Sequence, residues 1–469
     1  MDFSAANTQL WSFLLQFGAI AGIMLLANFL RRKLPIVKKT LMPTAVLAGF
    51  LLLIILMILR ESGIETTKFK NMLETITYHG IALGFIALSL RVPDEAEKKG
   101  VDRLTAPKSG ALIVSCYTIQ GIIGLVVTLA LAYTIMPGLF TASGLLLPMG
   151  YGQGPGQANN IGTTYQNLGF TGGRSFGLSL AASGYLSACV VGVIFLNVLW
   201  RKSKFTQTNV EEESGSVTIN TFQNQGEIPM SESIDKFSIQ MALVLGVYVI
   251  TYFVIRGITV LTGGLGEGLS KTISTLLWGF NFIVGTLIAM LICVIFKSLR
   301  KRNLMTRQYQ NNYLLSRVSG FAFDLMIIAG IALIDITDIK GLWLPFILMS
   351  VAGAAITLIY LRWMCKKIYA DYYYEGLLSM YGMMTGTISS GILLLREIDP
   401  LFKTPAANNL VTGSGMAIVF GAPMLALLGL APVSTTMTWL VLGLLVIYTA
   451  LLVLFMVKVK GKKKLVVNS

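Results

Sequence analysis

Two stretches of this 469-residue chain decide its fold. Residues 141–170 read TASGLLLPMGYGQGPGQANNIGTTYQNLGF, and residues 371–400 read DYYYEGLLSMYGMMTGTISSGILLLREIDP. Each begins with a short apolar run, passes through glycine-rich backbone and continues with small polar residues. Glycine weakens a helix by about 1 kcal/mol relative to alanine, and proline by roughly 3 kcal/mol. Gly152, Gly154 and Pro155 therefore predict a break in the first stretch.

The rest of the chain consists mainly of apolar runs. Hydrophobic residues make up 54% of the sequence and charged residues 13%, which is more apolar surface than a soluble protein of this length can hide. A run of about 20 apolar residues crosses a hydrocarbon core of about 30 Å as a helix. We expect about 11 such spans, near residues 10–30, 41–59, 75–91, 109–136, 174–200, 236–256, 271–297, 318–335, 341–363, 405–430 and 433–457. The predicted fold class is an all-α membrane protein.

The basic residues predict the orientation of the spans. The net charge is +15, and the lysines and arginines cluster in short connections between apolar runs. Cytoplasmic loops of membrane proteins are enriched in these residues. With the N-terminus outside, the inner connections hold roughly 30 of the 37 lysines and arginines. We therefore expect the central linker and the C-terminus in the cytoplasm, and we do not expect nucleic acid as a partner.

The spans form two groups of five, separated by a linker and followed by one extra helix. The predicted segments are 1–200 (first repeat), 201–235 (polar cytoplasmic linker), 236–430 (second repeat) and 431–469 (extra C-terminal span and basic tail). Because five is an odd number, the second group begins on the opposite side of the membrane, and a duplicated unit would be inverted. At an offset of 230 residues, Gly156 falls on Gly386 and Asn160 falls on Ser390. We therefore predict two inverted repeats.

Neither broken stretch changes sides of the membrane in this topology, so each is predicted to be a re-entrant hairpin. The hairpin at 141–170 would enter from outside and the hairpin at 371–400 from inside, so that their tips meet near the midplane. Backbone freed at a break cannot face lipid and must lie in protein or line a wet cavity. The alternative is that such glycine-rich stretches are external loops, or that their small residues serve helix packing.

Hairpin tips of this kind supply transport chemistry. Exposed carbonyl groups coordinate Na⁺, and the N-terminus of a half-helix offers N–H groups and partial positive charge to an anion. Neutral side chains, Thr163 and Thr164 among them, add donors and acceptors without the cost of buried charge. The predicted substrate-binding residues are Gly152, Gln153, Gly154, Gly156, Asn159, Asn160, Thr385, Gly386, Thr387, Ser389 and Ser390. The predicted coupling-ion residues are Gly382, Gly156, Ser389 and Asp324.

Asp324 is the one carboxylate placed well inside a predicted span. An acid at that depth is costly and is a functional candidate as a cation ligand, a proton carrier or a partner for a substrate amine. The alternative is a residue near the cytoplasmic end of its helix that pairs with Arg317. His79, the sole histidine, is placed near the outer start of its span, where a helix-end hydrogen bond is the simpler interpretation than a proton relay.

Three stretches of the sequence resemble the glutamate:sodium symporter family of bacterial secondary transporters. They are KKTLMPTAVLAGF at 38–50, GYGQGPGQANNIG at 150–162 and YGMMTGTISSG at 381–391. The resemblance implies two inverted five-span halves in the bacterial inner membrane and a mobile transport part that carries both hairpins. It also implies a scaffold through which two protomers pair, an elevator-like motion, and glutamate or a similar small anionic solute with Na⁺ as substrates.

Three functional hypotheses follow: a Na⁺-coupled symporter, a proton-coupled carrier of another organic anion with Asp324 as the proton carrier, and a passive channel lined by small residues. GYGQGPG lacks the Lys-Ser/Thr ending of a phosphate-binding loop. The sequence has no metal-ligand cluster and no Ser–His–Asp pattern. We therefore expect no enzymatic activity and no cofactor apart from Na⁺ as the coupling ion.

Overall fold

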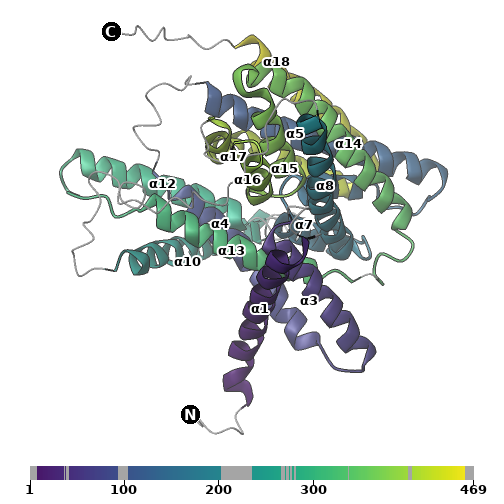
Figure 1. The fold of residues 1–469 in the computed structure, drawn as a ribbon, viewed down its shortest axis with the longest axis horizontal. Coiled ribbons are helices and arrows are strands. Elements are labelled where there is room, and N and C mark those ends of the chain that lie inside the picture. Colours follow the sequence, from purple (N-terminus) through teal and green to yellow (C-terminus); the bar gives the residue numbers. More distant parts are fainter. Residues whose placement is uncertain are drawn as a thin grey trace. The chain divides into compact units, whose positions relative to one another are not determined.

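The computed structural model describes residues 8–35, 37, 42–92, 104–201, 235–265, 270, 274, 277–278, 281–335, 337–399 and 404–459. The predicted linker at 202–234 and the basic tail at 460–469 lie outside these residues. Regular structure in the described part is helical (Figure 1). The helices are α1 (Thr8–Lys33), α3 (Thr44–Glu61), α4 (Thr67–Ser89), α5 (Thr105–Thr134), η2 (Thr141–Leu145), α6 (Leu146–Tyr151), α7 (Pro155–Asn167), α8 (Gly173–Arg201), α10 (Lys236–Thr262), η3 (Gly263–Leu265), α12 (Asn281–Lys301), α13 (Asn312–Ala332), α14 (Trp343–Ile368), η4 (Ala370–Tyr372), α15 (Tyr373–Thr385), α16 (Ile388–Arg396), α17 (Ala406–Leu430), η5 (Ala431–Val433) and α18 (Thr435–Lys458).

The chain is an all-α, multi-pass membrane protein. Among the described residues, 11 helices are long and apolar enough to cross a membrane. They are α1, α3, α4, α5, α8, α10, α12, α13, α14, α17 and α18. Each predicted span corresponds to one of these helices, so the predicted fold class is confirmed. The inversion of the two halves stays a prediction.

Two helices begin well before their predicted spans. Helix α4 begins at Thr67 rather than near residue 75, and α13 begins at Asn312 rather than near residue 318. The first turns of α4 contain Lys68 and Lys70, which lower the hydropathy without interrupting the helix. An apolar run therefore marks only the inner part of such a helix.

The earlier starts change where two polar residues lie. At 1.5 Å per residue, His79 is about 18 Å along α4 and Asp324 is about 18 Å along α13. Both therefore lie near the middle of their spans. The helix-end position expected for His79 is wrong, whereas Asp324 lies well inside its span as predicted and not at the helix end of the alternative. Nδ1 of His79 lies 2.6 Å from the hydroxyl of Tyr248, and the guanidinium of Arg317 stacks 5.0 Å from the ring centre of Tyr313. Among the described residues no ion pair joins Asp324 to Arg317.

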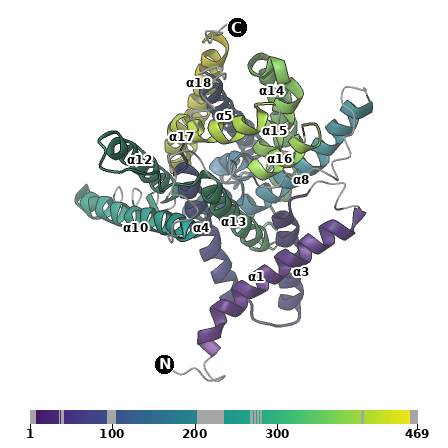
Figure 2. The ribbon, with the colours of Figure 1, turned by 60° about the vertical axis from the view of Figure 1, so that its left-hand side comes forward.

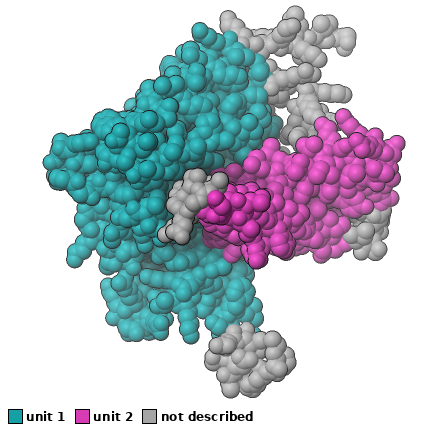
Figure 3. Space-filling model, turned by 180° about the vertical axis from the view of Figure 1, so that it is seen from behind, with its two compact units in different colours: residues 1–77, 104–208, 325–461 teal, residues 78–103, 209–324, 462–469 magenta. Residues whose placement is uncertain are grey.

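The described chain divides into two compact units, coloured separately in Figure 3. Unit 1 comprises 1–77, 104–208 and 325–461, and unit 2 comprises 78–103, 209–324 and 462–469. Each unit takes residues from both predicted halves. The division of the sequence into two repeats therefore does not coincide with the division of the fold into compact units. Both hairpin stretches belong to unit 1.

Helix α5 forms the centre of unit 1. Its spanning window is 67% buried, because α14, α17 and α18 all pack against it (Figure 2). The backbones of Gly124 in α5 and Gly144 in η2 touch, since a Cβ atom on either residue would overlap the other. The extra C-terminal helix α18 joins this core, and Thr449 donates a 2.7 Å hydrogen bond to Thr118 of α5.

Unit 2 is built from α10, α12 and the adjoining parts of α4 and α13. Its core holds Ile86 from α4, Val247 from α10, Ala289 from α12 and Leu315 from α13. Small residues allow the helices to approach closely in this core. At Gly285 of α12, a Cβ atom would lie 2.8 Å from Cδ1 of Ile86.

Candidate functional site

The first glycine-rich stretch folds back on itself as a broken helical hairpin. Helix α6 ends at Tyr151 and α7 begins at Pro155, and Gly154 between them has a φ of 84° that favours glycine. Proline then occupies the first position of α7, where its missing N–H costs nothing. Phe140 precedes the first arm and Phe170 follows the second arm, and the centres of their rings lie 5.3 Å apart. The two ends of the stretch are therefore neighbours, and residues 152–154 form its tip.

The second stretch folds in the same way. Helix α15 ends at Thr385, and α16 begins at Ile388 after a break at residues 386–387. A Cβ atom at Gly382 of α15 would lie 2.9 Å from the Cα of Gly391 in α16, so the two arms touch. Both arms pack against α8, as do both arms of the first hairpin.

The tips of the two hairpins meet. A Cβ atom at Gly154 would lie 3.6 Å from Cγ2 of Thr387 and 3.8 Å from the carbonyl oxygen of Gly386. Tyr185 of α8 packs against both tips. Its hydroxyl oxygen lies 3.5 Å from the place where a Cβ atom on Gly154 would be. Its Cδ1 atom lies 3.1 Å from the place where a Cβ atom on Gly386 would be. We call the contact of Gly154, Tyr185, Gly386 and Thr387 the hairpin junction.

Four helix ends converge near the hairpin junction. The second arms, α7 and α16, begin there, and the first arms, α6 and α15, end there. The first turn of a helix presents unpaired N–H groups and the last turn presents unpaired carbonyl groups. Each N-terminus carries roughly half a positive charge, and each C-terminus roughly half a negative charge. The junction therefore combines an anion-attracting and a cation-attracting environment, and no charged side chain among the described residues is buried in it.

Buried polar atoms without hydrogen-bond partners lie in the second arms. Gln157 of α7 is fully buried, and neither its amide nitrogen nor its amide oxygen has a partner. Oδ1 of Asn159 and Oγ of Ser390 are also unpartnered, although these residues are only 6% and 3% exposed. Oγ1 of Thr387 is unpartnered as well. An unsatisfied buried polar group costs about 1–3 kcal/mol, so such a concentration marks a place where a polar ligand would be stabilised.

The structure brings most of the predicted site residues together, but not all of them in the expected way. Gly152, Gln153 and Gly154 form the first tip, and Gly386 and Thr387 form the second. Gly156, Asn159 and Asn160 are buried in α7, whereas Thr163 and Thr164 are half-buried. Oγ1 of Thr385 donates to the carbonyl of Tyr381 and is occupied within its own helix. The side chain of Ser389 lies outside the described part, and Asp324 belongs to unit 2.

Three residues of this region were not predicted from the sequence. Gln157 stands beside the predicted asparagines, and only its burial distinguishes it. Tyr185 occurs in the apolar run of α8, and Gln120 is one polar residue within the apolar run of α5. A polar residue in the middle of a long apolar run was the one available signal for Gln120.

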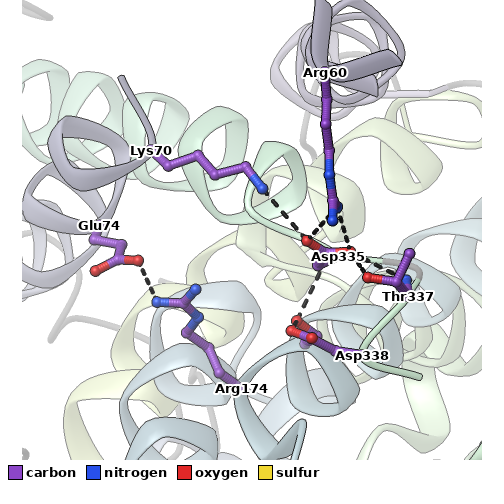
Figure 4. Close-up of polar contacts among 8 residues, drawn as sticks. Arg60, Lys70, Glu74, Arg174, Asp335, Thr337 and Asp338 are labelled. Atoms are coloured by element: carbon purple, nitrogen blue, oxygen red, sulfur yellow. Dashed lines mark hydrogen bonds and ion pairs between the residues drawn. The ribbon is translucent and has the colours of Figure 1, made fainter. Parts of the chain in front are cut away.

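A second polar cluster in unit 1 lies where the ends of α3, α4, α8 and α13 meet (Figure 4). Asp335 accepts from Arg60 at 2.9 Å and contacts Lys70 at 3.4 Å, and Arg174 pairs with Glu74. Thr337 also donates to Asp335, at 2.6 Å. Arg174, in the first turn of α8, thus forms an ion pair across to α4. In the predicted topology this cluster faces the outside.

Electrostatics sets the charge state of Asp335. Partial burial acts to raise the pKa of its carboxyl, but hydrogen bonds from Thr337 and the charges of Lys70 and Arg60 outweigh burial and lower the pKa below its usual value. The lowered pKa means that ionised Asp335 stabilises the folded state. This contribution is complete above the unfolded pKa of about 3.9 and is lost as the pH falls through the folded-state pKa.

Replacing Asp335 with asparagine is expected to destabilise the protein by about 1 kcal/mol at neutral pH, because exposed ion pairs contribute up to about that much each. Thermal unfolding in detergent between pH 3 and pH 7 would measure the effect. The difference from the wild type should shrink at the acid end, where Asp335 is protonated. Glu61→Gln, which changes an exposed carboxylate beside Arg60, is the control. An equal loss from both variants would contradict the assignment.

Comparisons with known proteins provide no identification. No protein-family model matches the sequence, and no curated protein matches it. Among the described residues, no group of three or more histidine, cysteine, aspartate or glutamate side chains is arranged to hold a metal ion. The functional argument therefore depends on the geometry of the hairpin junction.

Proposed function

We propose that this protein is a secondary active transporter that couples Na⁺ to the symport of glutamate or a similar small anionic solute. Its many apolar helices fit a membrane transporter or channel in general. The single observation that carries the more specific proposal is the contact between the two hairpin tips at Gly154, Gly386 and Thr387. Transporters with inverted repeats place substrate and ion sites between such broken segments.

The hairpin junction suits an anionic solute. The N-termini of α7 and α16 provide N–H groups and partial positive charge from two directions. Gln157 and Asn159 add amide groups, and Thr387 and Ser390 add hydroxyl groups, all with unpartnered atoms. Such neutral donors can bind a carboxylate and release it again, because they carry no fixed positive charge that would hold it permanently.

The second tip also suits a cation. The Cβ position of Gly386 lies 2.8 Å from Oγ of Ser390 and 3.1 Å from the carbonyl oxygen of Gly382. Two oxygen atoms thus converge on one point at the end of α15, where the helix carries partial negative charge. Hard cations such as Na⁺ prefer oxygen ligands of this kind. Of the predicted coupling-ion residues, Gly382 is the one whose position supports the proposal, with Ser390 beside it.

The resemblance to the glutamate:sodium symporter family extends the proposal. Unit 1 contains both hairpins and would be the mobile transport part, and unit 2 would belong to the scaffold through which two protomers pair. Exchange of the solute across the bacterial inner membrane would then follow an elevator-like movement of unit 1. The homodimer, the N-terminus-outside orientation and the movement are parts of the proposal.

Uptake into liposomes tests the proposed function. We expect the purified protein to accumulate labelled glutamate above its external concentration when an inward Na⁺ gradient is imposed. A choline gradient should give no accumulation, and a Na⁺ ionophore should abolish it. Equilibration without uphill accumulation would indicate a channel. Accumulation driven by a pH gradient alone would indicate a proton-coupled carrier, and no uptake of any dicarboxylate or amino acid would overturn the substrate class.

A further inference from the structure

A buried glutamine of α5 links the two hairpins of unit 1. The side-chain nitrogen of Gln120 donates to the carbonyl oxygen of Met384 at 2.9 Å and to Oγ1 of Thr357 at 2.9 Å. A carbonyl oxygen only accepts hydrogen bonds, so the NH₂ group must face Met384. The orientation of the amide is thereby fixed, and its oxygen must face the other way.

The amide oxygen of Gln120 faces the tip of the first hairpin. It lies 3.1 Å from the Cβ position of Gly152, the residue that caps α6. Gln120 is fully buried, and its Oε1 accepts no hydrogen bond from the described residues. Two backbone N–H groups at this tip are already used, because Gly152 donates to the carbonyl oxygen of Pro148 and Gly154 donates to that of Gly150.

The surroundings of this oxygen favour positive charge. Helix α6 ends at Tyr151 beside it, and α15 ends at Thr385, one residue after the carbonyl that holds the amide nitrogen. Both helix C-termini carry partial negative charge near Gln120. The two oxygens that hold the amide nitrogen, those of Met384 and Thr357, are neutral. A neutral amide oxygen such as Oε1 suits a monovalent alkali ion better than a divalent ion, which needs carboxylates to balance its charge.

We propose that Oε1 of Gln120 is a ligand of a Na⁺ ion bound at the end of α6, at a position separate from the one between Gly382 and Ser390. This inference rests on the proposed Na⁺-coupled function and adds a second ion position to it. Because the amide is held by Met384 of the second hairpin and faces Gly152 of the first, this ion binds only when both hairpins are seated. Ion binding at this position therefore requires an assembled hairpin junction.

Na⁺ titration of the purified protein tests this position. The measurement is the Na⁺-dependent rise in melting temperature in detergent, with choline keeping the ionic strength constant. For Gln120→Met, which keeps the side-chain length and removes both the amide oxygen and the amide nitrogen, we expect the half-maximal Na⁺ concentration to rise at least tenfold. Thr357→Val, which removes one acceptor of the amide nitrogen but keeps Oε1, should shift it less than twofold.

A second variant, Gly152→Ala, tests the same oxygen by adding a methyl group near it. The methyl group would lie 3.1 Å from Oε1 and would overlap the ring of Tyr117, so the ring must shift. It should also raise the half-maximal Na⁺ concentration, and it keeps the test valid if Gln120→Met does not fold.

The outcomes separate this inference from the proposed function. A wild type that responds to Na⁺ and two variants with unchanged Na⁺ midpoints would overturn the ion position while leaving Na⁺-coupled transport intact. A wild type without any Na⁺ response would overturn both. Unchanged Na⁺ midpoints combined with lost discrimination between glutamate and glutarate would overturn the ion assignment and place the amide on the ammonium group of the solute.

Discussion

Replacing Gly184 with alanine is expected to reduce solute uptake at least tenfold without preventing membrane insertion. Gly184 lies on α8, one residue before Tyr185, where the second hairpin packs most closely. A Cβ atom there would overlap the carbonyl oxygen of Thr385 and lie 3.3 Å from the Cα of Tyr151. Backbone atoms cannot rotate away as a side chain can, so α8 must separate from one of the hairpins. A displacement of about 1 Å at a binding site is enough to cost roughly a hundredfold in activity.

The control for this prediction is Gly443→Ala on α18, where a Cβ atom would meet nothing within 4 Å. Both variants add one methyl group to a glycine in a membrane-spanning helix. Initial rates of labelled solute uptake in liposomes, normalised to the amount of reconstituted protein, would measure the effect. Size-exclusion profiles in detergent would show that both variants remain folded. Equal uptake by Gly184→Ala and Gly443→Ala would show that the contact between α8 and the second hairpin does not serve transport.

The spans of this protein could be predicted from sequence because the bilayer imposes a length and a composition on each of them. Each of the 11 apolar helices was anticipated by an apolar run. The first turns of α4 and α13 were missed for a physical reason. In the first turns of α4, Lys70 pairs with Asp335 and Glu74 pairs with Arg174, so the helix continues where the hydropathy falls.

The two hairpins were predictable because glycine and proline act locally. Gly154 and Pro155 break the first stretch where their backbone preferences dictate, and Gly386 and Thr387 break the second. The opposed entry of the hairpins, inferred from the odd number of spans, led to the expectation that the tips meet. The contact between Gly154 and Gly386 in unit 1 agrees with that expectation.

The residues that complete the junction could not be predicted, because their importance arises from packing between distant segments. Tyr185 is one aromatic residue in an apolar run until α8 is placed against both tips. In the sequence, Gln120 is one isolated amide. Only the fold shows that Met384, which lies 264 residues further along the chain, accepts its hydrogen bond. Asp324 shows the opposite situation, because its residue type and position in a span were enough to single it out.

Replacing Asp324 with asparagine is expected to reduce uphill accumulation of solute at least tenfold while preserving exchange of labelled for unlabelled solute. The carboxylate is half-buried near the middle of α13, and no ion pair neutralises it among the described residues. An acid at this depth is costly, and a cation that binds it during function offsets that cost. Asparagine keeps the shape of the side chain and removes its charge. Coupling to a cation should therefore fail, whereas binding of the solute at the hairpins of unit 1 should persist.

Uptake under an imposed Na⁺ gradient and under an imposed pH gradient would show which cation binds Asp324. Wild-type accumulation driven by an inward Na⁺ gradient, and lost in Asp324→Asn, would make the carboxylate part of Na⁺ coupling. Accumulation driven by a pH gradient without Na⁺, and lost in the same variant, would make it a proton carrier. Asp371→Asn, which neutralises an exposed carboxylate in η4 at the start of the second hairpin stretch, is the matched control and should accumulate solute normally. Undiminished accumulation in Asp324→Asn under both gradients would assign this carboxylate a purely structural role, and the coupling ion would then depend on the oxygen atoms at the hairpin tips alone.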